Sequence, residues 1–322
     1  MLLKVLGGFL KSRLGAPTPL VLCHQLTLRC NLRCPFCPFW RRKRGEELST
    51  EEVKELIEQA SQLGCAIYTV WGGEPLLRRD LEECLRHAKS LGMRTYLITN
   101  GVLWRRAARA ASCLDYMSVS IDGTSQVYRR LRGVEVEHAL CSLEEARRRG
   151  VKAAINCVVC EANLGELEKL VELAERHGAG ISFEPVHRFE EVPAEEWEWL
   201  RIRSREKYEH AIEGLIRMKK AGRKVLNSFT YLRMMKRLRP DFRCAVHAIM
   251  LHVDAAGNVE TCFGRVGSVR EHSLAELWRS PAAREARRLM LTCRRCLFSG
   301  YAEASLLYSL KPEVVLNTLR IL

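Results

Sequence analysis

Three cysteines near the start of the chain, Cys30, Cys34 and Cys37, follow a short apolar segment in a Cys-x3-Cys-x2-Cys pattern. A [4Fe–4S] cube normally takes four thiolates, so three thiolates leave one iron open to another ligand, such as the amino and carboxylate groups of an amino acid. The alternative is a zinc site, which usually has four closed ligands and could recruit Cys23 or His24. The pattern therefore predicts an iron–sulfur cluster with one open iron, with zinc as the alternative.

Four further cysteines form a second group near the C-terminus: Cys244, Cys262, Cys293 and Cys296. Four thiolates are a full set for one closed cluster or one zinc ion. The remaining cysteines lie among apolar residues, and free cysteine packs as a small hydrophobe, so we interpret them as core residues. They are Cys23, Cys65, Cys84, Cys113, Cys141, Cys157 and Cys160.

From residue 20 to 186 short apolar runs alternate with helical patterns, which predicts βαβ units and a parallel sheet covered by helices. The predicted strands are 21–28, 67–71, 95–99, 116–121, 151–159 and 181–184, with two more short strands around 254–258. A capping box at Ser49 to Glu52 predicts a helix that ends at Gly64, and a single helix ending at Gly150 is predicted between the fourth and fifth strands. Sites in such folds lie at the carboxyl ends of the strands. The cysteine loop, the GGEP run at 72–75, Asn100-Gly101 and the segment 120–123 each follow a predicted strand. The sequence therefore places its polar and glycine-rich signals at one edge of an α/β sheet.

These motifs resemble those of radical S-adenosylmethionine (SAM) enzymes. CNLRCPFC at 30–37 resembles the family signature, and GGEP resembles the segment that binds the SAM amino group. SVSIDG at 118–123 and YRRLRG at 128–133 resemble the segments that approach the SAM ribose and carboxylate. The resemblance implies SAM contacts from Phe36, Gly72, Gly73, Glu74, Ser120, Asp122, Arg132, Asn156 and Val186.

The same resemblance implies a partial (β/α)6 TIM-like barrel and a common first step. In the family the reduced cluster donates one electron to SAM, and the resulting 5′-deoxyadenosyl radical abstracts hydrogen from an unactivated carbon. The protein must position that carbon and exclude water. A ferredoxin or flavodoxin is the expected electron donor. Glu184, at the end of the sixth predicted strand, is a candidate catalytic carboxylate or a hydrogen-bonded structural group.

The second cysteine group resembles the SPASM-type module that binds auxiliary [4Fe–4S] clusters. No cysteine follows Cys296, so the resemblance implies one auxiliary cluster, with a structural zinc ribbon as the alternative. We expect an N-terminal amphipathic segment (1–19), a radical SAM core (20–186), a helical connector (187–243), the auxiliary-cluster module (244–300) and a helical tail (301–322).

The formal net charge is +14, and we interpret most of it as solvated helix faces with internal ion pairs. We expect a cytoplasmic enzyme that oxidises or cross-links a peptide or protein side chain, with a small-molecule or lipid substrate as the alternative. An alternative of another class is a non-catalytic zinc or nucleic-acid-binding protein, but no aromatic residues are interleaved with the basic ones as single-strand binders require. The apolar ends predict either packing on the barrel or peripheral membrane contact. Arg41, Arg42, Lys43 and Arg44 form either a solvated run or an anion site.

Overall fold

The structure is a computed structural model that describes residues 2–13, 15–43 and 45–321, with the side chains of 2–6, 10, 104, 106–109 and 321 left out. The predictions for Arg44 and for the side chains of Leu2, Leu3, Val5, Leu6 and Leu10 lie outside this description.

A single sheet forms the frame of the described chain, in the order β6-β5-β4-β3-β2-β1-β7-β8-β9. Pairing is parallel from β6 through β7, and β8 and β9 add antiparallel strands. The strands are β1 (Val21–Thr27), β2 (Ile67–Gly72), β3 (Arg94–Thr99), β4 (Tyr116–Ser120), β5 (Lys152–Val159), β6 (Gly180–Pro185), β7 (Met250–Val253), β8 (Asn258–Thr261) and β9 (Gly264–Ser268).

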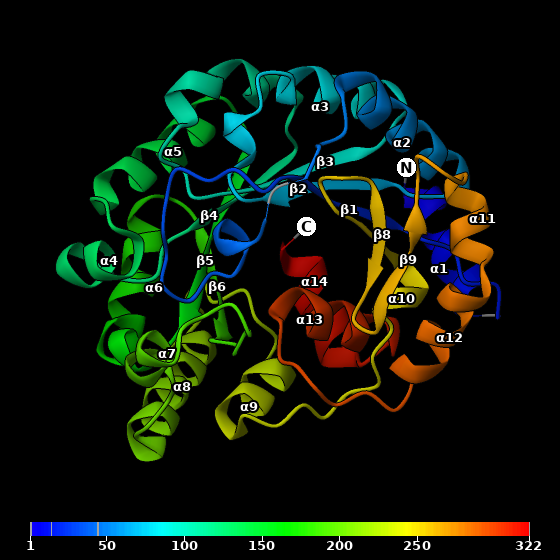
Figure 1. Cartoon of the computed structure of the whole chain (residues 1–322). Coiled ribbons are helices and arrows are strands. Elements are labelled where there is room, and N and C mark those ends of the chain that lie inside the picture. Colours follow the sequence, from blue (N-terminus) through cyan, green and yellow to red (C-terminus); the bar gives the residue numbers. More distant parts are fainter. Residues whose placement is uncertain (1, 14, 44, 322) are drawn as a thin grey trace.

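Helices cover the outer side of the sheet, and two C-terminal helices, α13 and α14, lie inside its curve (Figure 1). The α-helices are α1 (Leu2–Arg13), α2 (Thr50–Leu63), α3 (Leu81–Ser90), α4 (Ser125–Arg132), α5 (Val136–Arg148), α6 (Leu167–Arg176), α7 (Ala194–Leu200), α8 (Arg205–Lys220), α9 (Phe229–Arg237), α10 (Val246–Ile249), α11 (Leu274–Arg279), α12 (Pro281–Met290), α13 (Ser299–Tyr308) and α14 (Pro312–Ile321). Short 3-10 helices are η1 (Phe39–Arg41), η2 (Pro75–Leu77), η3 (Trp104–Cys113) and η4 (Glu161–Glu166).

The predicted α/β fold, a partial TIM-like barrel, is confirmed, because β1 to β6 form in the predicted places with helices between them. The predicted start and end of α2 are also confirmed. Ser49 and Glu52 form a reciprocal capping box, and Gly64 ends the helix at a φ of 113°. One difference lies between β4 and β5, where two helices replace the single predicted one, because Gly133 at a φ of 77° ends α4.

The C-terminal segment joins the barrel sheet instead of forming a separate sheet. β7 pairs in parallel with β1, so that Cys23 lies beside His252, and β8 and β9 continue from it. The strand β9 was missed in the sequence, because its exposed glycines and arginine lack the alternation of a half-buried strand. β1 is therefore a central strand that is hydrogen-bonded on both sides.

One face of β1 and β2 packs in the hydrophobic core, and the other face lies toward the interior of the barrel. Leu22 and Leu26 are fully buried with Tyr68 in the main hydrophobic core. Cys23 and Gln25 lie on the opposite face of β1, because successive side chains of a strand point to opposite sides. Residues on that second face are available to line the interior of the barrel.

The N-terminal helix α1 packs on the C-terminal part of the chain. Phe9 packs against Leu20, Ile249 and Met290, and its ring lies 5.4 Å from that of Tyr308. For the described residues of α1, this arrangement favours the packing alternative over membrane contact. None of the helices described combines the length and the apolar character needed to cross a membrane.

We expect Phe9→Ala to lower the free energy of unfolding by about 2 kcal/mol, roughly half the cost for a fully buried phenylalanine. The matched control is Leu319→Ala on α14, where the side chain is 64% exposed and little should change. Urea unfolding followed by circular dichroism measures both. Equal effects of the two substitutions would contradict the packing of α1.

Candidate active site

The first cysteine group lies on the loop that leaves the carboxyl end of β1. Cys34 is buried, whereas Cys30 and Cys37 are partly exposed. Burial raises the pKa of all three thiols, that of Cys34 to about 12, and the three thiols repel one another when charged. A cluster ligand is a thiolate whose proton is released on metal binding, and a nearby positive charge lowers the cost of that charged form.

Arg132, at the end of α4, supplies that charge. Its Nη1 donates to Cys34 Sγ at 3.6 Å, and its guanidinium lies 5.1 Å from the ring of Phe36. Its Nε donates to Asp122 Oδ2 at 2.5 Å, and the two side chains are 10% and 0% exposed. Asp122 and the neighbouring thiol raise the pKa of Arg132, so the arginine is charged at any ordinary pH.

Asp122 ties this arginine to the end of the sheet. Its Oδ1 accepts from the backbone N–H of Val158 on β5 at 2.8 Å, and its carbonyl accepts from Asn163. Both carboxylate oxygens are thus used within the protein. Asp122 thus positions Arg132, and the SAM contact that the resemblance implies for it stays a prediction.

The glycine-rich segment after β2 runs in close contact with the cysteine loop. Gly73 N–H donates to Thr27 O at 2.7 Å, and a Cβ on Gly73 would lie 2.2 Å from Arg29 O. Gly72 has a φ of 151°, which L side chains rarely adopt, and a Cβ there would lie 2.3 Å from Thr27 O. Only glycines let these two backbones approach so closely, so the segment is fixed beside the cysteines.

Glu74 is fully buried and accepts three hydrogen bonds from its surroundings. Oε1 accepts from Thr99 Oγ1 at 2.7 Å and from Leu76 N–H at 3.0 Å, and Oε2 accepts from Asn100 N–H at 2.8 Å. Burial outweighs these donors and raises the pKa of Glu74 to about 7. Its side chain therefore holds the end of β3 against the GGEP turn, which leaves the turn's backbone to meet a ligand.

The remaining predicted SAM contacts lie on β4, on β5 and after β6. Ser120 is beside Asn156 in the register of β4 and β5. Asn156 donates to Glu184 Oε1 at 3.2 Å and accepts from Ser182 Oγ at 2.9 Å. Val186 packs in one apolar cluster with Phe36. The structure thus brings the predicted residues to one edge of the sheet, in two groups around the cysteine loop.

Glu184 is held between the barrel and α13. Besides Asn156, it accepts from Ser299 N–H at 3.0 Å, and burial raises its pKa. Of the two alternatives for this carboxylate, the hydrogen-bonded structural role agrees with these contacts.

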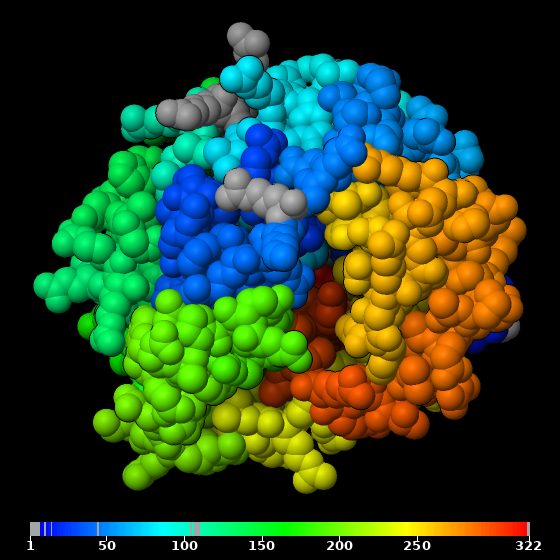
Figure 2. Space-filling model, in the orientation of Figure 1, coloured from blue at the N-terminus to red at the C-terminus, as the bar shows by residue number. Residues whose placement is uncertain are grey.

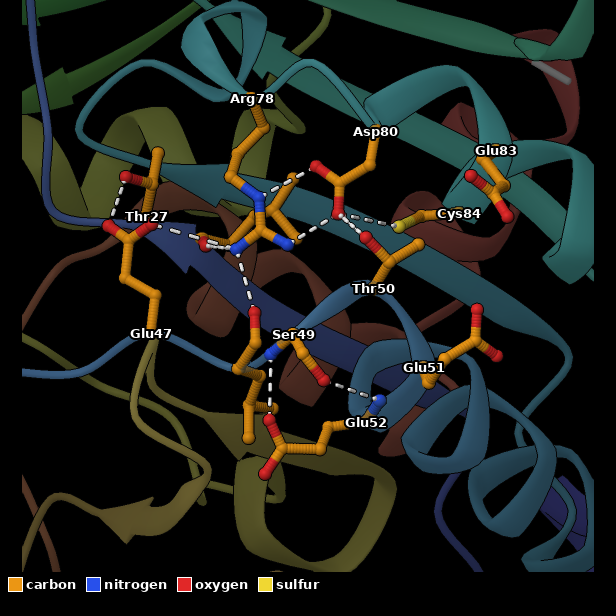
Figure 3. A network of polar contacts seen from close by, with 12 residues as sticks. Thr27, Glu47, Ser49, Thr50, Glu51, Glu52, Arg78, Asp80, Glu83 and Cys84 are labelled. Atoms are coloured by element: carbon orange, nitrogen blue, oxygen red, sulfur yellow. Dashed lines mark hydrogen bonds and ion pairs between the residues drawn. The ribbon is translucent and has the colours of Figure 1, made fainter.

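A buried arginine fixes the exit of the cysteine loop (Figure 3). Arg78 is paired with Asp80, with Nε–Oδ1 at 2.8 Å and Nη2–Oδ2 at 2.6 Å, and donates to Leu48 O at 3.0 Å. Its guanidinium also lies 3.6 Å from Glu47, which accepts from Thr27 Oγ1 at 2.5 Å. The end of β1, the start of α2 and the start of α3 are therefore joined through one guanidinium.

Two arginines of the basic run after the cysteines form ion pairs. Arg41 and Arg42 form ion pairs with Glu196 and Glu191. Arg42 also lies 5.0 Å from the ring of Phe39. These contacts favour a structural role for both arginines over an anion site.

The second cysteine group lies toward the amino end of β1, because β8 runs antiparallel to β7 and Cys244 packs in the cluster of Leu20. The charged forms of Cys262, Cys244, Cys293 and Cys296 lie within electrostatic range of one another. Within the described ranges, no three His, Cys, Asp or Glu side chains meet as a site for a single metal ion. The donor sets fit iron–sulfur clusters, with three thiols for a cluster with an open iron and four thiols for a closed one.

Two histidines that the sequence analysis missed hold the backbone beside these cysteines. His247 Nε2 accepts from Cys262 N–H at 3.2 Å, and His187 Nε2 accepts from Leu297 N–H at 3.1 Å. Burial lowers the pKa of each histidine to about 4, so both are neutral acceptors near pH 7. The contacts are long-range, and no local spacing in the sequence could have indicated them.

Comparison with protein families assigns both groups. The radical SAM superfamily model matches residues 25–174, and the model of the SPASM iron–sulfur cluster-binding domain matches residues 244–297. This chain is a radical SAM protein with a SPASM-type C-terminal module. Its cofactors are SAM, the [4Fe–4S] cluster of the radical SAM domain and an auxiliary iron–sulfur cluster.

Curated relatives of this radical SAM protein match about half of the chain. PqqA peptide cyclase of Rhizobium meliloti (strain 1021) is 32% identical over 166 residues, covering 49% of this chain and 44% of that protein. AdoMet-dependent heme synthase of Methanosarcina barkeri (strain Fusaro / DSM 804) is 32% identical over 176 residues, covering 50% of this chain and 48% of that protein. The match thus spans less than half the length of each of these relatives.

Solved structures share the fold over more of the chain. Streptococcus suis SuiB bound to S-adenosylmethionine has a TM-score of 0.70 at 16% identity, covering 84% of this chain and 68% of SuiB. Native anSMEcpe with bound AdoMet has a TM-score of 0.69 at 16% identity, covering 93% of this chain and 100% of anSMEcpe.

We expect Asp122→Asn to cost about 3–5 kcal/mol of stability, because it leaves the buried Arg132 charge uncompensated. The matched control is Glu135→Gln, which breaks an exposed pair with Arg129 and should cost less than about 1 kcal/mol. Chemical unfolding of the three proteins measures both values. A small loss of stability in Asp122→Asn would show that the buried Asp122–Arg132 pair does not stabilise this site.

We expect Glu74 to make stability depend on pH in a defined direction. A carboxyl group whose folded pKa is raised binds more protons when folded, so its contribution is complete below the unfolded pKa and is lost as pH rises through about 7. Glu74→Gln should remove this fall between about pH 4.5 and 7. Urea unfolding across that range measures it, and an unchanged pH profile in the variant would contradict the assignment.

Proposed function

We propose that this chain uses the cluster at Cys30, Cys34 and Cys37 to cleave SAM reductively and so to oxidise or cross-link a side chain of a peptide. When bound, the cluster and SAM supply a radical that abstracts hydrogen from an unactivated carbon. The protein's share is to keep the thiolates charged, to orient SAM and to hold the reacting carbon away from water. The observation that supports this proposal most strongly is the site after β1, where the three cysteines, the buried Arg132–Asp122 pair and the GGEP turn come together.

The residues of the chain have distinct roles in this proposal. Arg132 balances the charge of the Cys34 thiolate, and Asp122 keeps that arginine in place. The backbone of Gly72 to Glu74 would receive the SAM amino group, because Glu74 is already occupied by the end of β3. Ser120, Asn156 and Val186 line the sheet edge for the remainder of SAM.

The peptide substrate is supported by relatives and neighbours. One curated relative is named as a cyclase of the PqqA peptide. SuiB and anSMEcpe, which share the fold, have also been solved with peptides bound, the precursor peptide SuiA and the Cp18Cys peptide. These neighbours cover 87% and 93% of the chain, including its C-terminal part.

A small-molecule substrate is the second candidate. The relatives named pre-heme d1 synthase and AdoMet-dependent heme synthase match with 33% and 32% identity, as closely as the peptide cyclase does. A tetrapyrrole precursor is therefore the comparison substrate in any assay of this chain.

We expect the reconstituted and reduced protein to form 5′-deoxyadenosine from SAM and Cys34→Ala to form none, as quantified by mass spectrometry. Cys34→Ala and Cys262→Ala should each contain about half the iron of the unmodified protein, because each variant loses one of two clusters. The control is Cys141→Ala, a cysteine outside both groups, which should keep its iron. Zinc in place of iron at either group would contradict the proposal.

A further inference from the structure

A continuous row of neighbouring rings runs from beside the first cysteine group toward the second. Phe39 follows Cys37 by two residues, and His252 lies 6.2 Å from His247, which holds the backbone of Cys262. Neighbouring ring centroids along the row are 5.0 to 6.3 Å apart. We name this the aromatic row, and its members in order are Trp71, Phe39, Phe189, Phe298, Tyr301 and His252.

The rings of the aromatic row are only partly buried, although they lie inside the curve of the sheet. Rings that fill the core of this protein, such as Tyr68, Tyr231 and Phe183, are 0% exposed. Figure 2 shows this face of the molecule hollowed, with atoms of the C-terminal helices at the floor of the hollow. Partly exposed rings at such a place are typical of a surface that a ligand covers.

One side chain beside the aromatic row and one within it each have a polar atom that lacks a hydrogen-bond partner among the residues described. Gln25 is 5% exposed, and its Nε2 has no hydrogen-bond partner. The same holds for Nδ1 of His252, whose Nε2 is bound to Tyr301 at 2.9 Å. Gln25 is beside Trp71 in the sheet register, and His252 is beside Cys23, so both project from the face that lines the barrel interior.

An unpaired buried donor is costly, typically by about 1–3 kcal/mol, so these groups indicate a ligand that supplies the missing partners. The Gln25 amide needs an acceptor oxygen, such as a peptide carbonyl. Rings pack favourably against another ring, in offset-stacked or edge-to-face contact, so an aromatic group of the ligand matches the row.

We propose that the aromatic row receives an aromatic side chain of the peptide substrate, and that Gln25 donates to a carbonyl oxygen of that peptide. Trp71 and Phe298 contact the incoming ring, and the Tyr301–His252 pair limits how far it enters. This inference rests on the proposed peptide modification and adds the class of side chain that is modified or positioned.

The test is photo-cross-linking of the reconstituted full chain, with SAM present, to the peptide acetyl-Ala-(4-benzoylphenylalanine)-Ala-amide. We expect mass spectrometry to find the cross-links in segments 67–72 and 298–301. Acetyl-Ala-Tyr-Ala-amide should compete at about tenfold lower concentration than the corresponding leucine peptide, and the lysine peptide should compete least. Cross-links elsewhere, or equal competition by tyrosine and leucine, would overturn the proposal.

Gln25→Leu separates ligand recognition from structure. We expect it to raise the concentration of tyrosine peptide needed for competition about tenfold, while the melting temperature stays the same or rises, because an unpaired donor is removed. The matched control is Gln126→Leu, an exposed glutamine on α4, which should leave competition unchanged. Unchanged competition in Gln25→Leu, or a clear loss of stability, would overturn the proposed hydrogen bond from Gln25 to the peptide.

The outcome is distinguishable from failure of the proposed function. Formation of 5′-deoxyadenosine without any preference for the tyrosine peptide would overturn this inference alone. Cross-links at the expected segments without 5′-deoxyadenosine would support the inference and count against the radical chemistry.

Discussion

The site depends on the position of β1 between two parallel neighbours. β1 pairs with β2 on one side and with β7 on the other, and both pairings run in the same direction. The cysteine loop leaves the carboxyl end of β1, whereas β8 runs antiparallel to β7 and leads Cys262 back toward the amino end of β1. Two cysteine groups more than 200 residues apart are thereby attached to the same strand of the sheet, one toward each end of β1.

Charge is the second constraint on this edge. Three thiolates close together in a partly buried loop are unfavourable, and burial alone would keep them protonated. The buried Arg132 offsets this cost near Cys34, and Asp122 fixes the arginine while tying it to β5. At the second group neutral histidines bind the backbone, and at both groups the thiols lose their protons when they bind metal.

Much of the frame was predictable because it depends on local signals. Alternating apolar runs and the capping box at Ser49 gave six strands and α2 in their places, and the cysteine spacing indicated both cluster sites. The roles of Asp122 and Glu74 were not predictable, because the sequence does not show which donors meet a buried carboxylate. The aromatic row was also hidden, since Trp71, Phe189 and Phe298 come from three distant segments. Contacts of this kind follow from the fold and not from spacing.

Electron paramagnetic resonance of the reduced, reconstituted protein tests most directly whether the chain holds two distinct clusters of which only one binds SAM. We expect two [4Fe–4S] signals, of which one shifts when SAM is added and is absent in Cys34→Ala. The other signal should stay unshifted by SAM and disappear in Cys262→Ala. A single signal, or two signals that both stay unchanged when SAM is added, would contradict the assignment of two clusters with one SAM site.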